Sequence, residues 1–169
     1  VGVEAGRANA GDSRTVLRDR VALRLGQEEE LVVDPDLFRR LGEWVPGVRS
    51  VEVRLKPGRY RNELSRFRYD VLIELEGGGP EPESLPVRRI PWDPALVEGG
   101  LRRLLAAEPD QAVRVVGIPN ARTVDSVASV RTLDAGEGET VGDWRAASQG
   151  RGDRLRAEAV EPQDLVELG

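Results

Sequence analysis

Hydrophobic positions in the first part of the chain recur at helical spacing. Apolar residues at 16, 17, 21, 23 and 25 stand among Arg and Asp, which predicts a helix that Asp12 or Ser13 caps. A second helix is expected to start at Asp34, because an N-cap Asp followed by Pro35 is typical of a helix N-terminus. Residues 1–12 show no such period, and we expect them to form a mobile lead-in.

In the middle of the chain the hydrophobic period changes to two. Residues 51–55 alternate between apolar and charged, and within residues 67–75 every odd position is apolar. This alternation predicts two strands that each bury one face, and their order along the chain suggests an antiparallel pair. The connection over residues 56–66 is much longer than a tight hairpin turn, and loops of this length are often functional.

Weaker patterns follow in the second half of the chain. Clusters of Gly and Pro predict loops, and Asp93–Pro94 predicts another helix start. The elements expected after residue 76 are a linker over 77–82, a helix over 93–109, a strand over 112–117, a helix from Asn120 to Leu133, a loop over 136–142, a weak helix around Trp144 and a short helix after Pro162.

These elements predict an α+β fold with a small, mostly antiparallel sheet of three or four strands covered by helices. Strands 50–56 and 67–75 are expected to form its centre, and strand 112–117 is expected to join them. The predicted organisation is one domain over residues 13–135, on which a C-terminal loop and short helices over 136–169 pack.

The composition excludes several classes of catalyst. The 169 residues include no Cys and no His, so the chain has no thiol nucleophile, no Ser-His-Asp triad and no imidazole for a zinc site. Lys56 is the only lysine among 25 basic residues, so a Schiff-base enzyme would depend on it alone. We therefore expect no metal, no cofactor and no catalytic residue. There is also no Met, and we expect the chain to be a segment of a longer polypeptide.

The net charge of −5 and the pI near 5.0 argue against a general nucleic-acid binder, which usually carries a basic excess. No apolar run approaches the length of a membrane span. The sequence thus predicts no nucleic-acid partner, no membrane association and a cytoplasmic location. The strong preference for Arg over Lys, together with abundant Ala, Val and Gly, indicates a GC-rich bacterial genome.

One loop gathers most of the candidate chemistry. Between residues 56 and 70 the chain collects cations, two tyrosines and an amide, although it is acidic elsewhere. Such a loop can hold a phosphate, for example on a phosphopantetheine arm, or an acidic partner surface. Alternatively the loop satisfies itself, with Glu63 and Asp70 pairing with its arginines. The candidate residues are Lys56, Arg59, Tyr60, Arg61, Asn62, Arg66, Arg68, Tyr69 and Asp70.

Two short motifs carry little weight. The glycines at 77–79 and at 136–138 do not follow a strand and open a helix, as a phosphate-binding loop requires. Residues 151–153 spell an Arg-Gly-Asp adhesion tripeptide, but a three-residue match is frequent by chance. We expect that tripeptide to lie in a solvated loop.

Residues 51–73, VEVRLKPGRYRNELSRFRYDVLI, resemble a segment of the methyltransferase domains embedded in nonribosomal peptide synthetases and polyketide hybrids. In those domains a basic strand end is followed by Asn-Glu-Leu-(Ser/Thr) and an aromatic-Arg-Tyr strand. Residues 27–38 resemble the helix entry that precedes this segment, and residues 115–122 resemble the Gly-(Val/Ile)-Pro-Asn-Ala-Arg stretch that follows it. The resemblance extends over residues 15–135.

The resemblance implies the C-terminal part of a class I methyltransferase without its cofactor half. In that family S-adenosylmethionine binds a glycine-rich loop after the first strand of a doubly wound sheet, and this chain contains no such loop. No catalytic residue of the family can therefore be assigned here. By analogy, the chain is also similar to the domain of unknown function beside the cysteine-lyase domain of leinamycin-type hybrid synthases.

Three functions are compatible with these observations. The first is a non-catalytic structural or docking domain of a polyketide or nonribosomal peptide megasynthase that contacts an acyl or peptidyl carrier protein and neighbouring domains; it could also form a homodimer. The second is the lid half of a split S-adenosylmethionine-dependent methyltransferase. The third is an enzyme whose loop binds a phosphopantetheine-linked substrate while Asp70, Tyr60 or Tyr69 handles protons.

Overall fold

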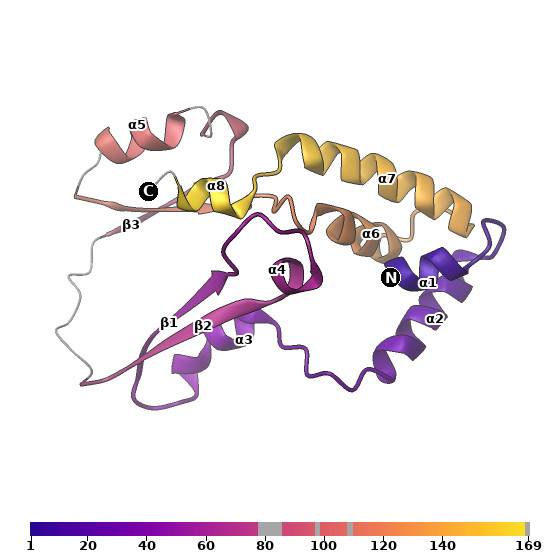
Figure 1. The fold of residues 1–169 in the computed structure, drawn as a ribbon, viewed down its shortest axis with the longest axis horizontal. Helices are drawn as coiled ribbons and strands as arrows, with labels where there is room; N and C mark the ends of the chain where they lie inside the picture. The colour runs from indigo at the N-terminus through magenta and orange to yellow at the C-terminus, as the bar shows by residue number, and fades with distance from the viewer. Residues whose placement is uncertain (78–85, 97–98, 108–109, 168–169) are drawn as a thin grey trace. The chain divides into compact units, whose positions relative to one another are not determined.

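The computed structural model describes residues 1–77, 86–96, 99–107 and 110–167 (Figure 1). The chain divides into two compact units. The first, which we call the helical unit, comprises Val1–Val33 and Pro119–Ala159. The second, the strand unit, comprises Asp34–Ile118 and Val160–Gly169. These boundaries differ from the predicted divisions after residues 12 and 135, because each unit combines segments that are distant in the sequence.

The helical unit contains α1 (Gly2–Arg7), α2 (Arg14–Gly26), α6 (Val124–Asp134) and α7 (Val141–Glu158). Helix α2 confirms the helix predicted over residues 16–25. Its N-cap is Ser13, whose hydroxyl oxygen accepts the backbone N–H of Val16 at 3.4 Å. Only Leu17 of this helix is buried, so the predicted apolar stripe is largely exposed.

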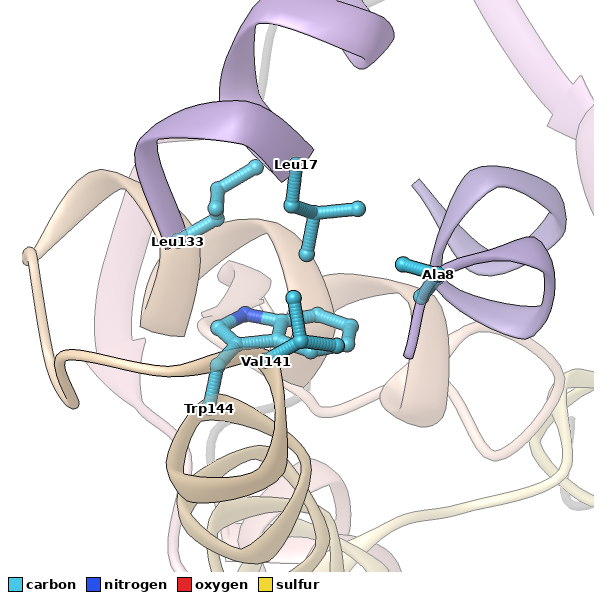
Figure 2. Packing of buried hydrophobic residues seen from close by; sticks show 6 residues of the cluster. Ala8, Leu17, Leu133, Val141 and Trp144 are labelled. Atoms are coloured by element: carbon cyan, nitrogen blue, oxygen red, sulfur yellow. The ribbon is translucent and has the colours of Figure 1, made fainter. Parts of the chain in front are cut away.

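Buried side chains from all four helices or their ends meet in one core. Figure 2 shows Leu17 of α2 pointing towards Val141 and the indole ring of Trp144 at the start of α7. The indole Nε1–H donates to the carbonyl oxygen of Ser129 at 3.3 Å, so the polar atom of the ring is satisfied inside the core. The core cluster consists of Ala5, Ala8, Leu17, Leu133, Val141 and Trp144.

A helix forms where the sequence predicted a mobile lead-in. Residues 2–7 form α1, and Ala5 and Ala8 are buried in the core cluster. The Arg145 guanidinium donates to the carbonyl oxygens of both alanines, at 2.7 Å for Ala8. The hydrophobic period is weak here because the buried residues are alanines, and the contacts that hold them come from a distant helix.

Helix α7 has 18 residues, whereas the sequence predicted only a weak helix around Trp144. A capping box stabilises its start: the Thr140 hydroxyl accepts the N–H of Asp143 at 3.1 Å, and the Asp143 carboxylate accepts the N–H of Thr140 at 3.1 Å. The same carboxylate accepts the Thr140 hydroxyl, which lowers the pKa of Asp143. The apolar period of α7 is weak because small residues supply much of its buried face.

The Arg-Gly-Asp tripeptide lies within α7, so the prediction of a solvated loop is wrong. Gly152 is buried, and a Cβ added to it would meet the Asp125 carboxylate of α6 at 3.3 Å. Arg151 donates to the Thr132 hydroxyl at 3.2 Å and forms an ion pair with Glu137. The tripeptide therefore contributes to contacts inside the helical unit.

In the strand unit, β1 (Val48–Leu55) and β2 (Tyr69–Leu75) form the predicted antiparallel pair. Helix α3 (Pro35–Arg39) precedes them and starts as predicted, because the Asp34 carboxylate accepts the N–H of Asp36 at 2.8 Å. The helix ends at Arg39, and a short 3-10 helix, η1 (Leu41–Glu43), follows it.

The third predicted strand pairs with a strand that the sequence did not reveal. β4 (Ala112–Val116) runs parallel to β3 (Val87–Pro91) and does not join β1 and β2. The α+β class with small sheets and helices is confirmed, and the described strands form two separate two-stranded sheets, one antiparallel and one parallel. β3 was missed because two adjacent arginines interrupt its alternation.

The remaining helical elements are short. They are α4 (Glu63–Phe67), η2 (Pro94–Leu96), α5 (Gly100–Ala107) and α8 (Pro162–Val166). The structure confirms the helix predicted after Pro162 and shows η2 and α5 within the predicted helix 93–109. Pro109 and most of the predicted linker over 77–82 lie outside the described residues. The helix predicted from Asn120 begins later, at Val124, because the Asn120 side chain accepts the N–H of Arg122 in a preceding turn.

None of the helices in the described part of the chain has both the length and the apolar character that a membrane span requires.

Candidate functional site

The candidate loop connects β1 to β2 and contains the five-residue helix α4. A capping box fixes the start of this helix: the Asn62 side chain accepts the N–H of Ser65 at 3.0 Å, and the Ser65 hydroxyl accepts the N–H of Asn62 at 3.2 Å. The Ser65 hydroxyl also donates to the carbonyl oxygen of Tyr60. Ser65 is buried, and its hydrogen bonds link the start of α4 to Tyr60 and Asn62.

Lys56 and Asp70 close the base of the loop. Asp70 lies opposite Arg54 in the strand register, but its carboxylate forms an ion pair with Lys56. Both side chains are only partly exposed. The one lysine of the chain and the acidic residue of the candidate set are therefore brought together, and they neutralise each other.

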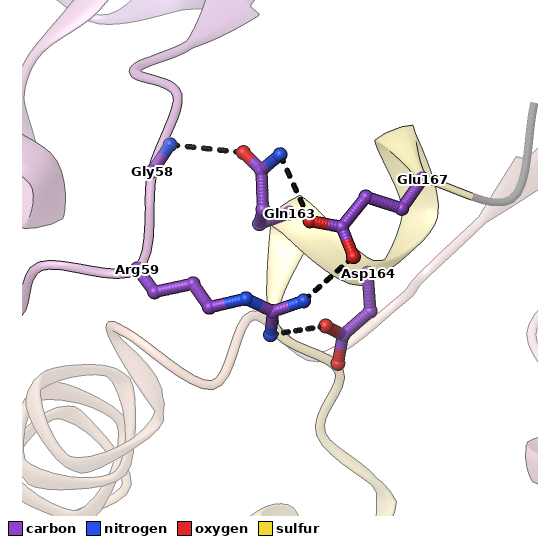
Figure 3. A network of polar contacts seen from close by, with 5 residues as sticks. All are labelled: Gly58, Arg59, Gln163, Asp164 and Glu167. Atoms are coloured by element: carbon purple, nitrogen blue, oxygen red, sulfur yellow. Dashed lines mark hydrogen bonds and ion pairs between the residues drawn. The ribbon is translucent and has the colours of Figure 1, made fainter.

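Arg59 is held by the C-terminal helix α8 (Figure 3). Its guanidinium donates to Asp164 at 2.5 Å and to Glu167 at 2.8 Å. Next to it, the backbone N–H of Gly58 donates to the Gln163 side chain at 2.9 Å. Gly58 has a φ of +92°, a conformation that glycine adopts easily. These contacts join two segments of the strand unit that are about a hundred residues apart in the sequence.

The carboxylates of Asp164 and Glu167 affect both the pKa and the charge balance of Arg59. Because Asp164 accepts a hydrogen bond from it and both acids lie close by, the pKa of Arg59 is raised above its ordinary value. Its charge is thus already matched inside the chain. We infer that Arg59 orders the loop, and we do not assign it to a ligand.

The other three cations of the loop differ from Lys56 and Arg59 in the groups that surround them. Arg66 of α4 lies over the ring of Phe67, with the guanidinium carbon 5.2 Å from the ring centre. Arg61 and Arg68 lie at the two ends of α4 and are exposed. Within the described part of the chain, neither Arg61 nor Arg68 forms an ion pair. These two arginines are therefore the cations best placed to meet a partner.

The two tyrosines differ in their environment. Tyr69 is partly buried, and its ring packs edge-to-face on Phe38 of α3, with ring centres 6.2 Å apart. Tyr60 has 79% of its side chain exposed. Tyr69 thus belongs to the packing of α3 on the sheet, whereas Tyr60 belongs to the surface of the loop.

Several residues of this site make contacts that the sequence did not predict. Gln163, Asp164 and Glu167 stand on one short helix, and their spacing places them near one another, but nothing local in the sequence indicates the loop that they contact. Phe38 was predicted to lie on a helix but not to meet Tyr69. Long-range pairing of this kind has no signal in a single sequence.

A second surface of interest is the apolar face of β1 and β2. The cross-strand pairs Val51–Ile73 and Val53–Val71 place apolar side chains opposite each other. The pairs on the other face are Ser50–Glu74, Glu52–Leu72 and Arg54–Asp70, in which only Leu72 is apolar. None of these four residues is buried, and Ile73 is 44% exposed. Among the described residues of the strand unit, Val160 is the only hydrophobic residue that is buried.

A metal site is not visible in the described ranges, because no group of three or more acidic, His or Cys residues is placed to hold an ion. The site offers cations, aromatic rings and an apolar sheet face. This chemistry suits contact with another macromolecule through charge and apolar area.

No protein family model matches the chain. Among curated proteins, it is 35% identical to the chondramide synthase of Chondromyces crocatus and 35% identical to a nonribosomal peptide synthetase of Salinispora arenicola, each over 85% of the chain. It is 33% identical to the cyclosporin synthetase of Tolypocladium inflatum over 72% of the chain. The chain is similar to a segment of nonribosomal peptide synthetases.

The chain spans only 4%, 2% and 1% of the length of these three relatives. The relatives are therefore very large proteins in which the matching segment is one small part. They support the predicted origin in a multidomain peptide synthetase of natural-product biosynthesis. The relatives include fungal proteins, so they do not confirm a bacterial source, and they confirm neither a polyketide synthase nor a methyltransferase.

Proposed function

We propose that the chain is a non-catalytic structural or docking domain of a nonribosomal peptide synthetase, which packs against neighbouring domains of the same polypeptide. The observation that carries this proposal is the apolar face of β1 and β2, which the described strand unit leaves incompletely covered. The relatives support it, because in each of them the matching segment is embedded in a far longer chain.

The small size of the sheet limits its stability. A two-stranded sheet is marginally stable in water by itself, and it needs further strands or a packed helix. Here α3 contributes Phe38 to one end of the face, yet Ile73 and Leu75 at the other end are 44% and 60% exposed. Covering these side chains would gain roughly 25 cal/mol for each Å² of apolar area removed from water. A neighbouring domain that supplies this cover would stabilise the strand unit.

Hydrogen exchange tests the proposal. The β1 and β2 amides would be measured in the isolated chain and in the intact synthetase polypeptide. We expect the amides of residues 71–75 to exchange at least about tenfold more slowly in the intact synthetase, since added cover suppresses local opening. Equal exchange in both contexts would contradict packing on a neighbour.

A pair of variants on one strand localises the contact. Ile73→Asn places an amide on the apolar face, and Leu72→Asn places the same group on the opposite face, where the register pairs it with Glu52. Ile73→Asn is expected to abolish the added protection in the intact synthetase, whereas Leu72→Asn should retain it. If both variants lose protection equally, the apolar face is not the contact surface.

A second candidate is the C-terminal half of a split S-adenosylmethionine-dependent methyltransferase. The same antiparallel pair favours it, because the first half of such an enzyme would supply cover for an open apolar face. The resemblance of residues 51–73 and 115–122 to embedded methyltransferase domains also supports it. Mixing the chain with the N-terminal half of such a domain and measuring S-adenosylmethionine binding tests this candidate: binding by the mixture but by neither part alone is expected. Unchanged binding would exclude it.

A further inference from the structure

The helix α4 and its two ends form a surface that combines exposed apolar side chains with unmatched positive charge. Leu64 and Phe67 are three residues apart on α4, so they lie on one side of the helix, and they are 53% and 57% exposed. Arg61 precedes the N-cap and Arg68 is the C-cap. We call these four residues the α4 surface.

Internal contacts divide four of the five cations of the loop into two groups, and the fifth, Arg66, lies over the Phe67 ring. Lys56 and Arg59 are neutralised by Asp70, Asp164 and Glu167. Arg61 and Arg68 have no ion pair in the part of the chain that the structure describes. The chain as a whole carries a net charge of −5.

The surface is also presented in a fixed conformation. The capping box of Asn62 and Ser65 sets the start of α4, and the contacts of Gly58 and Arg59 with α8 hold the preceding residues. A preorganised surface loses less conformational entropy when a partner binds. Aromatic residues and arginines are enriched in protein–protein interfaces relative to the rest of the protein surface.

We propose that the α4 surface docks an acidic protein surface, namely that of a carrier protein of the same synthetase. This inference rests on the proposed function, since it names one partner of the docking domain. Charge complementarity selects the partner: Arg61 and Arg68 attract carboxylates, which accelerates association and fixes orientation. Leu64 and Phe67 supply apolar area at the centre of the contact.

The experiment measures binding of an isolated carrier-protein domain, without its prosthetic arm, to the chain by isothermal titration calorimetry. The test variant is Arg61→Glu/Arg68→Glu. The matched control is Arg102→Glu/Arg103→Glu, which makes the same charge change at two exposed arginines of α5 in the same unit. Far-UV circular dichroism checks that both variants fold like the original chain.

We expect the test variant to weaken carrier binding by at least about tenfold, the control to leave it within about twofold, and added salt to weaken binding of the original chain. A Phe67→Ala variant should also weaken binding, which charge attraction alone would not explain. Equal weakening by test and control variants would overturn the proposal, because it would show a non-specific charge effect. The absence of carrier binding by the original chain would also overturn it.

Two further measurements distinguish this proposal from binding of a second copy of the chain and from the proposed function. Sedimentation of the chain alone shows whether the α4 surface instead binds a second copy; a dimer that Arg61→Glu/Arg68→Glu dissociates would overturn the carrier assignment. Hydrogen exchange of β1 and β2 in the intact synthetase reports on the proposed function through a different surface. Added protection there together with no carrier binding would overturn only the α4 proposal.

Discussion

The helical unit and the strand unit bury their hydrophobic residues to very different extents. In the helical unit, Leu17 and Val141 are completely buried and Trp144 is 3% exposed. In the strand unit, Trp44 is 50% exposed, although the Arg40 guanidinium lies 5.3 Å from its ring centre. Most of the aromatic residues of the chain lie in the strand unit, so its poorer burial does not come from a lack of large apolar side chains.

The difference lies in how many elements share each core. Four helices of the helical unit contribute to one cluster, although most apolar residues of α2 outside this cluster stay exposed. In the strand unit, each described sheet has two strands, and α3 packs on one of them. The helical unit closes its core with its own residues, whereas we propose that the strand unit depends on a neighbour.

The largest predicted effect separates the two tryptophans. Trp144→Ala should lower the free energy of unfolding of the helical unit by about 3–5 kcal/mol, because it leaves a cavity in a packed core. Trp44→Ala should cost less than about 1 kcal/mol, since half of that side chain already contacts water. Urea denaturation followed by circular dichroism measures both. Similar costs for the two variants would refute the contrast between the units.

A smaller effect is expected where α1 joins the core. Arg145→Leu should cost about 1.5–3 kcal/mol, because the carbonyl groups of Ala5 and Ala8 lose a charged hydrogen-bond donor. Hydrogen exchange of residues 2–8 should accelerate in this variant. Arg154→Leu, at an exposed position of the same helix, is the control and should leave that exchange unchanged. Unaltered exchange in Arg145→Leu would show that α1 does not depend on this contact.

The capping box of α7 also stabilises the helical unit. Thr140→Ala should cost about 1 kcal/mol, because the N–H of Asp143 loses the hydroxyl that accepts it. Thr140→Ser keeps the hydroxyl and should lose much less. Thermal unfolding of the three proteins measures the effect. An equal loss in Thr140→Ala and Thr140→Ser would show that the methyl group, and not the cap, is responsible.

The smallest predicted effect depends on pH. The Thr140 hydroxyl lowers the pKa of Asp143 below its ordinary value of 3.8, so the folded state favours the carboxylate. This contribution to stability is present above the ordinary pKa and disappears as the pH falls through the lowered one. Thermal melts from neutral pH to about pH 3 should therefore show a smaller decrease in Tm for Asp143→Asn than for the original chain. Parallel curves would contradict the assignment.

Local patterns predicted the elements whose caps and period are encoded in adjacent residues. Ser13, Asp34 and the alternation of β1 and β2 belong to this group, and the structure confirms each of them. In β3 two adjacent arginines interrupt the alternation of apolar and polar residues. The strand is defined by its pairing with β4. The helix α1 depends on Arg145, which no local pattern connects to it.

The composition of the sequence indicated the candidate loop, but it did not indicate which contacts the residues of the loop make. Its cations and tyrosines are local features of the sequence. That Arg59 meets Asp164 while Arg61 does not pair within the described residues follows from the position of α8, which is a tertiary contact. The position of the loop is therefore evident from local sequence, whereas the arginines that are already neutralised are evident only from tertiary contacts.

The order of segments in the helical unit has a consequence for biosynthesis. Residues 1–33 and 119–159 form this unit, and Arg145 and Ala5, which contact each other, are 140 positions apart. A ribosome releases the N-terminal helices first, and these helices must wait for α7 before their core can close. Contacts of such long range also slow folding. During that interval Leu17 and its neighbours are exposed in the nascent chain, so this segment is a natural target for chaperones.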